Sequence, residues 1–156
     1  MKITWIEPDT IAAGSIPLGE KDIRSLHEQG IRAILTLTEH ALTAQKEITP
    51  DLLTSFDMVC FHAPIDDGYP PEPPLMHAIV KFLTDMGEQK RAVYVHCHAG
   101  VGRTGTVLHG HYLAKGLSLE ETQNRIKTLK LTSSFIMLSE SQRKFLVDFA
   151  DQNRLK

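Results

Sequence analysis

The chain has 156 residues, a formal net charge of −2 and 42% hydrophobic residues. These values predict one compact domain, residues 1–156, whose core needs no disulfide framework, and they argue against nucleic acid as the main partner. The two cysteines, Cys60 and Cys97, favour a reducing compartment. Because the chain also lacks an apolar signal segment and any apolar run of ~18 residues, we expect a cytoplasmic protein with no membrane partner.

Short apolar runs alternate with polar stretches over the first 65 residues. This pattern predicts strands at residues 3–6, 10–13, 31–37 and 58–65. A helix is predicted over residues 20–29, with Gly30 as its C-terminal stop. One or two helical turns are predicted over residues 50–56, whereas residues 39–50 fit neither pattern.

The segment Asp66–Pro74 contains four prolines and a glycine, which predicts a loop without regular hydrogen bonding. It leads into a predicted helix over residues 75–89 and a predicted strand over residues 92–95. Strand, helix and strand form the parallel crossover unit, which brings the carboxyl ends of both strands to one edge of the sheet. Since ligands bind off these ends in open α/β sheets, the proline-rich loop and the segment after Val95 should face each other across one cleft.

The turn after Val95 carries the residues best suited to chemistry. Its sequence is His96-Cys97-His98-Ala99-Gly100-Val101-Gly102-Arg103-Thr104-Gly105. A glycine-containing turn between a strand and a helix start can aim several backbone N–H groups at one point, and the helix dipole adds about half a positive charge there. Such a nest accommodates a phosphate or another tetrahedral oxyanion.

Two side chains of this turn fit the nest. The Cys97 thiol, surrounded by N–H dipoles and close to a cation, is expected to be largely ionised at neutral pH and therefore nucleophilic. Arg103, separated from Cys97 by five residues, can hold two phosphate oxygens at once and keeps its charge. Thr104 is placed to donate a hydrogen bond to the sulfur, and His96 to fix the loop by hydrogen bonds to backbone carbonyls.

This segment resembles the signature of the cysteine-dependent protein tyrosine phosphatase superfamily, and most of all its small (atypical) dual-specificity branch. The resemblance implies that Cys97 attacks phosphorus to give a cysteinyl-phosphate and that no cofactor or metal is needed. It implies a monomer that acts on phosphotyrosine, phosphoserine or phosphothreonine in proteins. The implied phosphate-binding residues are His98, Ala99, Gly100, Val101, Gly102, Arg103 and Thr104.

The resemblance also implies a fold. We expect an α/β three-layer sandwich with a mostly parallel central sheet of four to five strands and helices on both faces. The remaining helices fit this fold: residues 104–115, residues 119–130 after a capping box at Ser118, and a last helix after a cap near Ser139. A turn is predicted over residues 132–134.

A general acid must protonate the departing oxygen. The family places an aspartate about 30 residues before the cysteine, and Asp67 precedes Cys97 by 30 residues (97 − 67). The family pattern Pro-Ile-Pro-Asp matches Pro64-Ile65-Asp66-Asp67 if Asp67 is the acid, although Asp66 replaces the second proline. Asp66 therefore remains the alternative acid, and two solvated loop aspartates are the structural alternative.

Other interpretations remain open. The same chemistry could act on a phosphoinositide or another non-protein phosphate, although His98 and Val101 stand where lipid-directed relatives tend to carry basic residues. A phosphoprotein-binding module without catalysis and a sulfur- or arsenate-handling enzyme are further alternatives. A metal site built from His96, His98, His109 and His111 is disfavoured, because residues two apart on a helix face different directions.

For two residues, Gln142 and Cys60, both a structural and a functional role are considered. Gln142 resembles the glutamine that positions water in some tyrosine phosphatases, but a capping or packing role is the commoner one. Cys60 is predicted either to be a small buried hydrophobe or, if the two Cα atoms come within about 7 Å, to trap an oxidised Cys97 as a disulfide.

Overall fold

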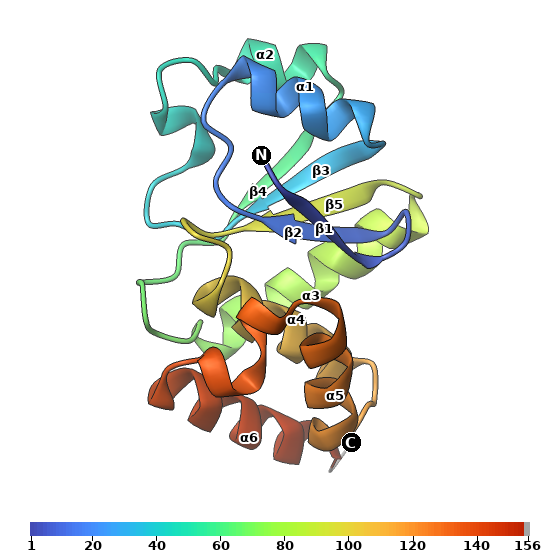
Figure 1. Ribbon diagram of the computed structural model, residues 1–156, viewed down its shortest axis with the longest axis vertical. Helices are drawn as coiled ribbons and strands as arrows, with labels where there is room; N and C mark the ends of the chain where they lie inside the picture. Colours follow the sequence, from blue (N-terminus) through green and yellow to red (C-terminus); the bar gives the residue numbers. More distant parts are fainter. Residues whose placement is uncertain (155–156) are drawn as a thin grey trace.

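A five-stranded sheet runs through the middle of the molecule in the computed structural model, which describes residues 1–154 (Figure 1). Its strands are β1 (Ile3–Glu7), β2 (Ile11–Gly14), β3 (Ile31–Thr36), β4 (Val59–His62) and β5 (Ala92–His96). The order across the sheet is β1-β2-β5-β3-β4; β1 is antiparallel to β2 and every other neighbouring pair is parallel. The predicted mostly parallel α/β fold is confirmed.

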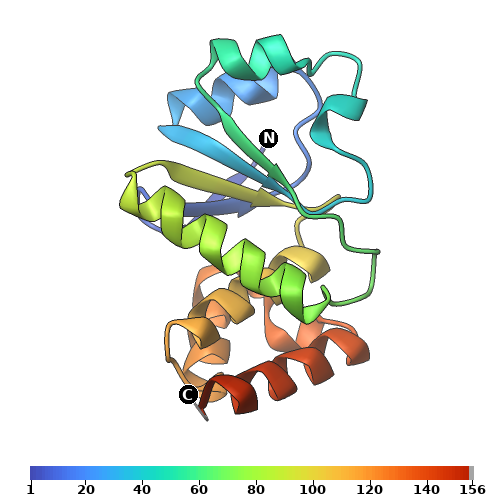
Figure 2. The ribbon, with the colours of Figure 1, turned by 180° about the vertical axis from the view of Figure 1, so that it is seen from behind.

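Helices cover both faces of the sheet (Figures 1 and 2). One face carries the two helices α1 (Glu20–Glu28) and α2 (Pro50–Ser55). The opposite face carries α3 (Pro73–Glu88), α4 (Gly102–Ala114), α5 (Leu119–Leu129) and α6 (Glu140–Arg154). Each side has its own apolar core, and the sheet separates the two.

The central strand β5 is buried at all five positions and pairs with β2 on one side and β3 on the other. Its side chains divide between the two cores: Tyr94 faces α1 and α2, whereas Val93 and Val95 pack on the opposite side with Val107 of α4. A strand covered on both faces is apolar throughout rather than alternating, which explains the short run Ala92–Val95.

Local sequence signals set most helix boundaries. The Ser118 hydroxyl accepts from Glu121 N while the Glu121 carboxylate accepts from Ser118 N, which is the predicted capping box. The helix α3 begins at Pro73, two residues before the predicted start, because proline is tolerated in the first helical turn. Similarly, α4 begins at Gly102 rather than at Thr104.

Three segments differ from simple expectation. The strand β4 is shorter than the predicted 58–65, although Ala63 N and Ile65 N still donate to Thr36 O and Leu37 O, so that the chain continues beside β3. The undecided stretch 39–50 contains a short 3₁₀ turn, Leu42–Ala44. Two more 3₁₀ turns, Leu131–Ser133 and Phe135–Met137, join α5 to α6 where a single turn was predicted.

None of the described helices is long and apolar enough to cross a lipid bilayer.

Candidate active site

The turn between β5 and α4, residues 97–102, is named the catalytic loop below. Gly100 has φ of +77°, and a Cβ at this position would lie 2.4 Å from Gly14 O of β2. Both the left-handed conformation and the close approach of another backbone therefore require glycine here. The loop can make its tight turn only because this residue carries no side chain.

Neighbouring segments hold the carbonyl groups of the catalytic loop turned outward. Ile16 N donates to His98 O (3.0 Å), and the Ser133 hydroxyl donates to Gly100 O (3.0 Å) and Val101 O (3.1 Å). Within one peptide unit the carbonyl and the following N–H point in opposite directions. The N–H groups after these carbonyls consequently point into the loop, and the N–H groups of Ala99 and Val101 meet no acceptor within residues 1–154. They form the predicted anion nest.

The Cys97 side chain lies at the bottom of this nest. The residue is only 3% exposed, and the Thr104 hydroxyl donates to Cys97 Sγ at 3.3 Å. This contact confirms the predicted Thr104–sulfur hydrogen bond. A hydroxyl in this place stabilises negative charge on the sulfur, both before attack and when the thiolate leaves.

His96 fixes the start of the loop, as predicted. Its Nδ1 lies 2.9 Å from Cys97 O and its Nε2 lies 2.9 Å from Thr36 Oγ1. Because a carbonyl only accepts, Nδ1 carries the proton and Nε2 accepts from the Thr36 hydroxyl. Burial lowers the pKa of His96 to about 4, despite the bond to Cys97 O, so the ring is neutral at physiological pH.

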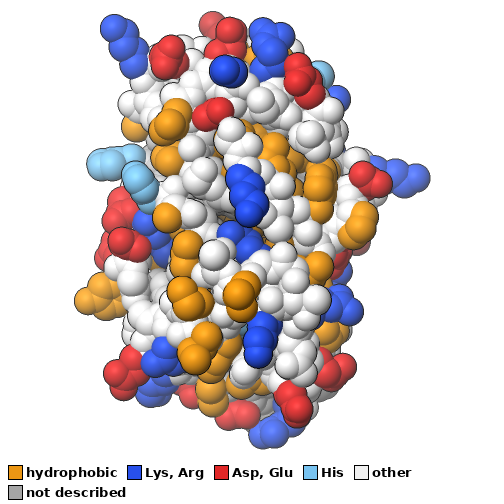
Figure 3. Space-filling model, in the orientation of Figure 1, with side chains coloured by type: hydrophobic (Ala, Val, Ile, Leu, Met, Phe, Trp, Pro, Cys, Tyr) orange, Lys and Arg blue, Asp and Glu red, His pale blue; other side chains and the backbone are white. Residues whose placement is uncertain are grey.

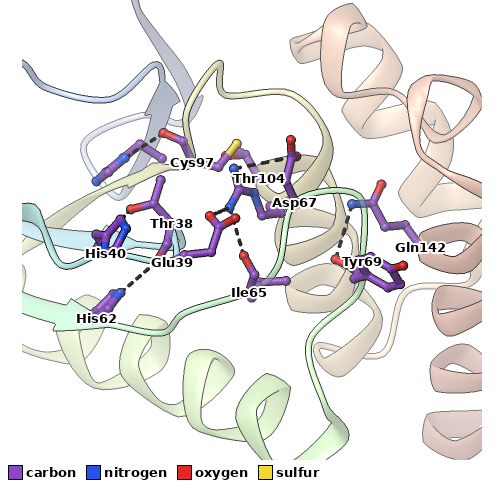
Figure 4. A network of polar contacts seen from close by, with 12 residues as sticks. Thr38, Glu39, His40, His62, Ile65, Asp67, Tyr69, Cys97, Thr104 and Gln142 are labelled. Atoms are coloured by element: carbon purple, nitrogen blue, oxygen red, sulfur yellow. Dashed lines mark hydrogen bonds and ion pairs between the residues drawn. The ribbon is translucent and has the colours of Figure 1, made fainter.

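The guanidinium of Arg103 is buried, and it contacts Glu39, Ile65 and Asp67, which are labelled in Figure 4. Nη1 donates to Ile65 O (2.9 Å) and to Glu39 Oε1 (2.5 Å). Nε is buried and has no acceptor among the described residues, and Nη2 lies 3.7 Å from Asp67 Oδ1. The Nε and Nη2 donors lie on the same edge of the guanidinium, and this edge fits two oxygens of one oxyanion.

Glu39 is a residue that the sequence reasoning missed. It follows β3, which is the neighbour of β5, and its carboxylate is half-exposed. Hydrogen bonds from its own backbone N–H and from Arg103 lower the pKa of this carboxyl. The signal that could have found it is an acidic residue just beyond the carboxyl end of a predicted inner strand, on the sheet edge that carries Cys97.

Of the two candidate aspartates, the structure brings Asp67 to Arg103 and directs Asp66 elsewhere. The Asp67 carboxylate is 3.7 Å from Arg103 Nη2, and its side chain is 83% exposed. Asp66 instead lines a separate hollow together with Tyr69, Pro71 and Phe145. The geometry thus favours Asp67 as the carboxyl group that faces the anion nest.

The start of α6 holds the loop that carries Asp67, residues 66–72, named the acid loop below. The hydroxyls of Ser139 and Ser141 donate to Gly68 O at 2.7 and 3.2 Å, and Gln142 Nε2 donates to Tyr69 O at 3.4 Å. Gln142 Oε1 also accepts from Ser139 N (2.9 Å), which is the capping role expected of it. Side chains of α6 and of the residue before it therefore fix the acid loop at two consecutive carbonyls.

The alternative of a disulfide between Cys60 and Cys97 is ruled out, because the condition on their separation is not met. Cys60 lies on β4 opposite Ile34 of β3, and Ile34 lies opposite Tyr94 of β5, so β3 separates the two cysteine-bearing strands. Two strand spacings amount to about 10 Å, and the three residues from Tyr94 to Cys97 add roughly 10 Å along the strand. A disulfide requires Cα atoms within about 7 Å. Cys60 is also exposed, so it is not the buried hydrophobe expected otherwise.

The histidines considered for a metal site are engaged separately. His109 Nδ1 lies 2.6 Å from Gly105 O within α4, and His111 Nε2 lies 3.9 Å from Glu7 Oε1. Residues 1–154 contain no cluster of three or more His, Cys, Asp or Glu side chains that could hold a metal ion. Arg103 and the backbone dipoles supply positive charge at the nest.

A family model described as "PTP-SAK: Swiss Army Knife protein, DSP-PTPase phosphatase domain" matches residues 1–154. The chain belongs to this family. As a member of the DSP-PTPase family it is a cysteine-dependent phosphatase, and the arrangement of Cys97 in an anion nest agrees with that chemistry.

Solved structures share the fold of this DSP-PTPase domain. A mutant form of Tk-PTP superposes with a TM-score of 0.85 at 20% identity, covering 99% of this chain and 98% of that one. PTPMT1 superposes with a TM-score of 0.83 at 22% identity, covering 99% and 97%. Kinase associated phosphatase, with its catalytic-site cysteine replaced by serine, superposes with a TM-score of 0.81 at 20% identity, covering 100% and 97%.

Proposed function

We propose that this phosphatase hydrolyses phosphotyrosine in proteins, and phosphoserine or phosphothreonine as secondary substrates, through a cysteinyl-phosphate on Cys97. The observation that carries the proposal is the Nε–Nη2 edge of Arg103, which makes no hydrogen bond to the described residues, together with a buried thiol that accepts from Thr104. This set holds two oxygens of a phosphoryl group with the sulfur ready to attack phosphorus.

The proposed reaction has two steps. The Cys97 thiolate forms a bond to phosphorus while the bond from phosphorus to the leaving oxygen breaks, and Asp67 gives its proton to that oxygen. The Asp67 carboxylate then takes a proton from water as the water oxygen attacks phosphorus, which releases inorganic phosphate and the thiolate. The loop N–H groups and Arg103 stabilise the charge on the three equatorial oxygens in both steps.

Preference for an aromatic ester is supported by exposed apolar side chains on the acid loop and on the segment that holds both loops. Tyr69 belongs to the acid loop and is 61% exposed. Ile136 and Met137 are 81% and 55% exposed, and they lie between Ser133, which binds the catalytic loop, and Ser139, which binds the acid loop. Exposed apolar side chains on these segments are available to pack against the ring of a bound phosphotyrosine, and such packing stabilises binding.

A phosphoinositide is the second candidate substrate. One structure with the same fold is PTPMT1 in complex with PI(5)P, at 20% identity and a TM-score of 0.82. Against it, the catalytic loop of this chain carries His98 and Val101 rather than lysine or arginine. Within residues 97–103, an inositol head group with several phosphates would find one arginine, Arg103, and no lysine.

The test is a substrate panel at one pH and ionic strength, containing phosphotyrosine, phosphoserine and phosphothreonine peptides, PI(5)P vesicles, inositol phosphates and nucleotides. We expect kcat/KM to be highest for phosphotyrosine peptides. Cys97→Ser, whose hydroxyl is hardly ionised at neutral pH, should abolish turnover of every substrate while orthovanadate still binds. A higher kcat/KM for vesicles than for any peptide would overturn the assignment to proteins. If Cys97→Ser kept an activity within tenfold of the wild type, the assignment of Cys97 as the nucleophile would be wrong.

A further inference from the structure

A pocket lies beside the catalytic loop, and the reaction proposed above does not use it. Its volume is about 520 Å³, and two of its walls are Ala99 and Val101 of the catalytic loop. Other walls are formed by Gly14 at the end of β2, by Ser15 after it, and by the end of α5 with the turn that follows it (residues 129–132). A group in this pocket would therefore lie beside a phosphoryl group bound in the nest, separated from it by the loop itself.

The pocket is positively charged. Lys2 and Lys130 line it, and none of its lining residues within the described chain is Asp or Glu. Neither lysine has a carboxylate within 4 Å among residues 1–154, whereas Lys115, Lys144 and Lys81 elsewhere on the surface each have one. In Figure 3, basic side chains lie in the middle of the face on which Figure 1 places the N-terminus.

Lys130 is the more constrained of the two lysines. It is half-buried, and its ammonium group donates to the Thr132 hydroxyl at 3.1 Å. This hydroxyl is neutral and does not balance the charge of the ammonium group. Burial lowers the pKa of Lys130, the charge of Lys2 lowers it further, and the negative charge of Cys97 partly opposes both. A partly desolvated cation without a counter-ion is costly, and an anion that enters the pocket offsets this cost.

Neutral donors complete the lining. Thr4, Ser15 and Thr132 contribute hydroxyl groups, and none of these residue types carries a charge that would oppose an anion. Two ammonium groups and several hydroxyls form a donor set for the oxygens of a carboxylate or a phosphate.

We propose that Lys2 and Lys130 are specificity-determining residues that bind a second anionic group of the substrate, next to the phosphotyrosine in the peptide. This inference rests on the proposed phosphotyrosine activity. The second group is the carboxylate of an acidic residue or the phosphate of a second phosphorylated residue, because both present oxygens to the same lysines. Since the pocket shares Ala99 and Val101 with the nest, one peptide can occupy both at once.

The experiment uses a phosphotyrosine peptide with neutral neighbours, into which glutamate is introduced at each position on either side in turn. A third series carries phosphoserine at the same positions. The readout is the ratio of kcat/KM for the charged peptide to that for the neutral peptide, so that any general effect on activity cancels. For the wild type we expect a ratio of about 10 at the best position, a size typical of one charge-assisted contact.

Lys130→Met and Lys2→Met should each reduce this ratio, and the double variant should bring it close to one. Lys130→Arg, which keeps the charge, should retain most of it. Lys127→Met is the matched control, because Lys127 is exposed on α5, three residues before Lys130, and does not line the pocket. The wild-type ratio should also fall with rising salt, and the ratio of the double variant should not.

The outcomes separate the inference from the function on which it rests. A wild-type ratio near one at every position, or a ratio that the double variant leaves unchanged, overturns the role of the lysines. A higher ratio with glutamate than with phosphoserine identifies an acidic neighbour, and the reverse identifies a second phosphate. Hydrolysis of p-nitrophenyl phosphate without hydrolysis of any peptide overturns the phosphotyrosine proposal instead. An inositol bisphosphate that outperforms every peptide in a lysine-dependent manner overturns the peptide assignment.

Discussion

Arg103 Nη1 donates to the carboxylate of Glu39 at 2.5 Å, across 64 residues of sequence. Together with Ile65 O this contact occupies the terminal nitrogen that points away from the nest and leaves Nε and Nη2 for the substrate. Glu39 thus touches no substrate atom in the proposed reaction and acts on it through the orientation of Arg103. It is a positioning residue.

Replacing Glu39 by alanine should lower kcat/KM by about 10²-fold, because a displacement of the guanidinium by about 1 Å is enough for a loss of this size. Glu39→Gln should lose less, since its amide oxygen still accepts from Nη1. The measurement is steady-state hydrolysis of p-nitrophenyl phosphate, with vanadate inhibition to show that anion binding weakens in parallel. Glu88→Ala, an exposed carboxylate at the end of α3, serves as control. Equal activity of Glu39→Ala and this control would contradict the role.

Arg103→Lys should lower kcat by at least about 10²-fold, the cost of removing a preorganised donor to a developing oxyanion. An ammonium group is a point charge and does not reproduce the two parallel hydrogen bonds of the Nε–Nη2 edge. It also fails to contact Glu39 and Ile65 O at the same time as the substrate. Single-turnover kinetics would measure the effect on cysteinyl-phosphate formation directly. A lysine variant within tenfold of the wild type would show that charge alone suffices.

Asp67→Asn should lower kcat by about 10²–10⁴-fold for phosphotyrosine peptides, the usual range for a general acid. The defect should shrink for esters with good leaving groups, which need little protonation. Asp66→Asn is the matched control, because Asp66 lines a different hollow and does not reach Arg103. A series of aryl phosphates of graded leaving-group pKa measures the trend. The assignment to Asp67 is lost if Asp66→Asn has the larger defect.

Buried His96 should make the protein less stable as the pH falls. Its pKa is about 4 in the folded protein against 6.5 for the free group, so between these values the unfolded chain binds a proton that the folded protein does not. Stability therefore decreases from pH 6.5 downward, by about 3 kcal/mol in total, and the decrease is complete below pH 4.

Urea unfolding of the wild type and of His96→Asn between pH 7.5 and 4 measures this difference. The asparagine variant should be less stable at pH 7.5 but should lose less stability on acidification. His77→Asn, a change of an exposed histidine on α3, should keep the slope of the wild type. Identical slopes for all three proteins would show that folding does not lower the pKa of His96.

The catalytic loop and its support by His96 and Thr104 could be predicted from sequence because all of these residues are within nine positions of one another. Their contacts follow from local geometry, namely a strand, a glycine turn and a helix start. The parallel crossover likewise places Asp67 on the correct edge of the sheet, since β4, α3 and β5 are consecutive.

Contacts between distant segments could not be predicted in the same way. The Glu39–Arg103 bond depends on β3 lying between β4 and β5, and a single sequence does not specify that order. The same order separates Cys60 from Cys97 and rules out their disulfide. The hydrogen bonds from Ser139 and Ser141 to Gly68 O span more than 70 residues and depend on how α6 packs against α4.

The anion nest and the acid loop, which together form the site, belong to parts of the molecule that differ in their resistance to local unfolding. The anion nest follows β5, whose backbone is paired on both sides and covered by both cores, so its amide protons should exchange with solvent only on global unfolding. The acid loop is attached through exposed serine hydroxyls and one glutamine, and it can detach while the sheet stays intact. Mild heating or low denaturant would then leave an enzyme that still captures phosphate esters but turns over only those whose leaving groups depart unprotonated.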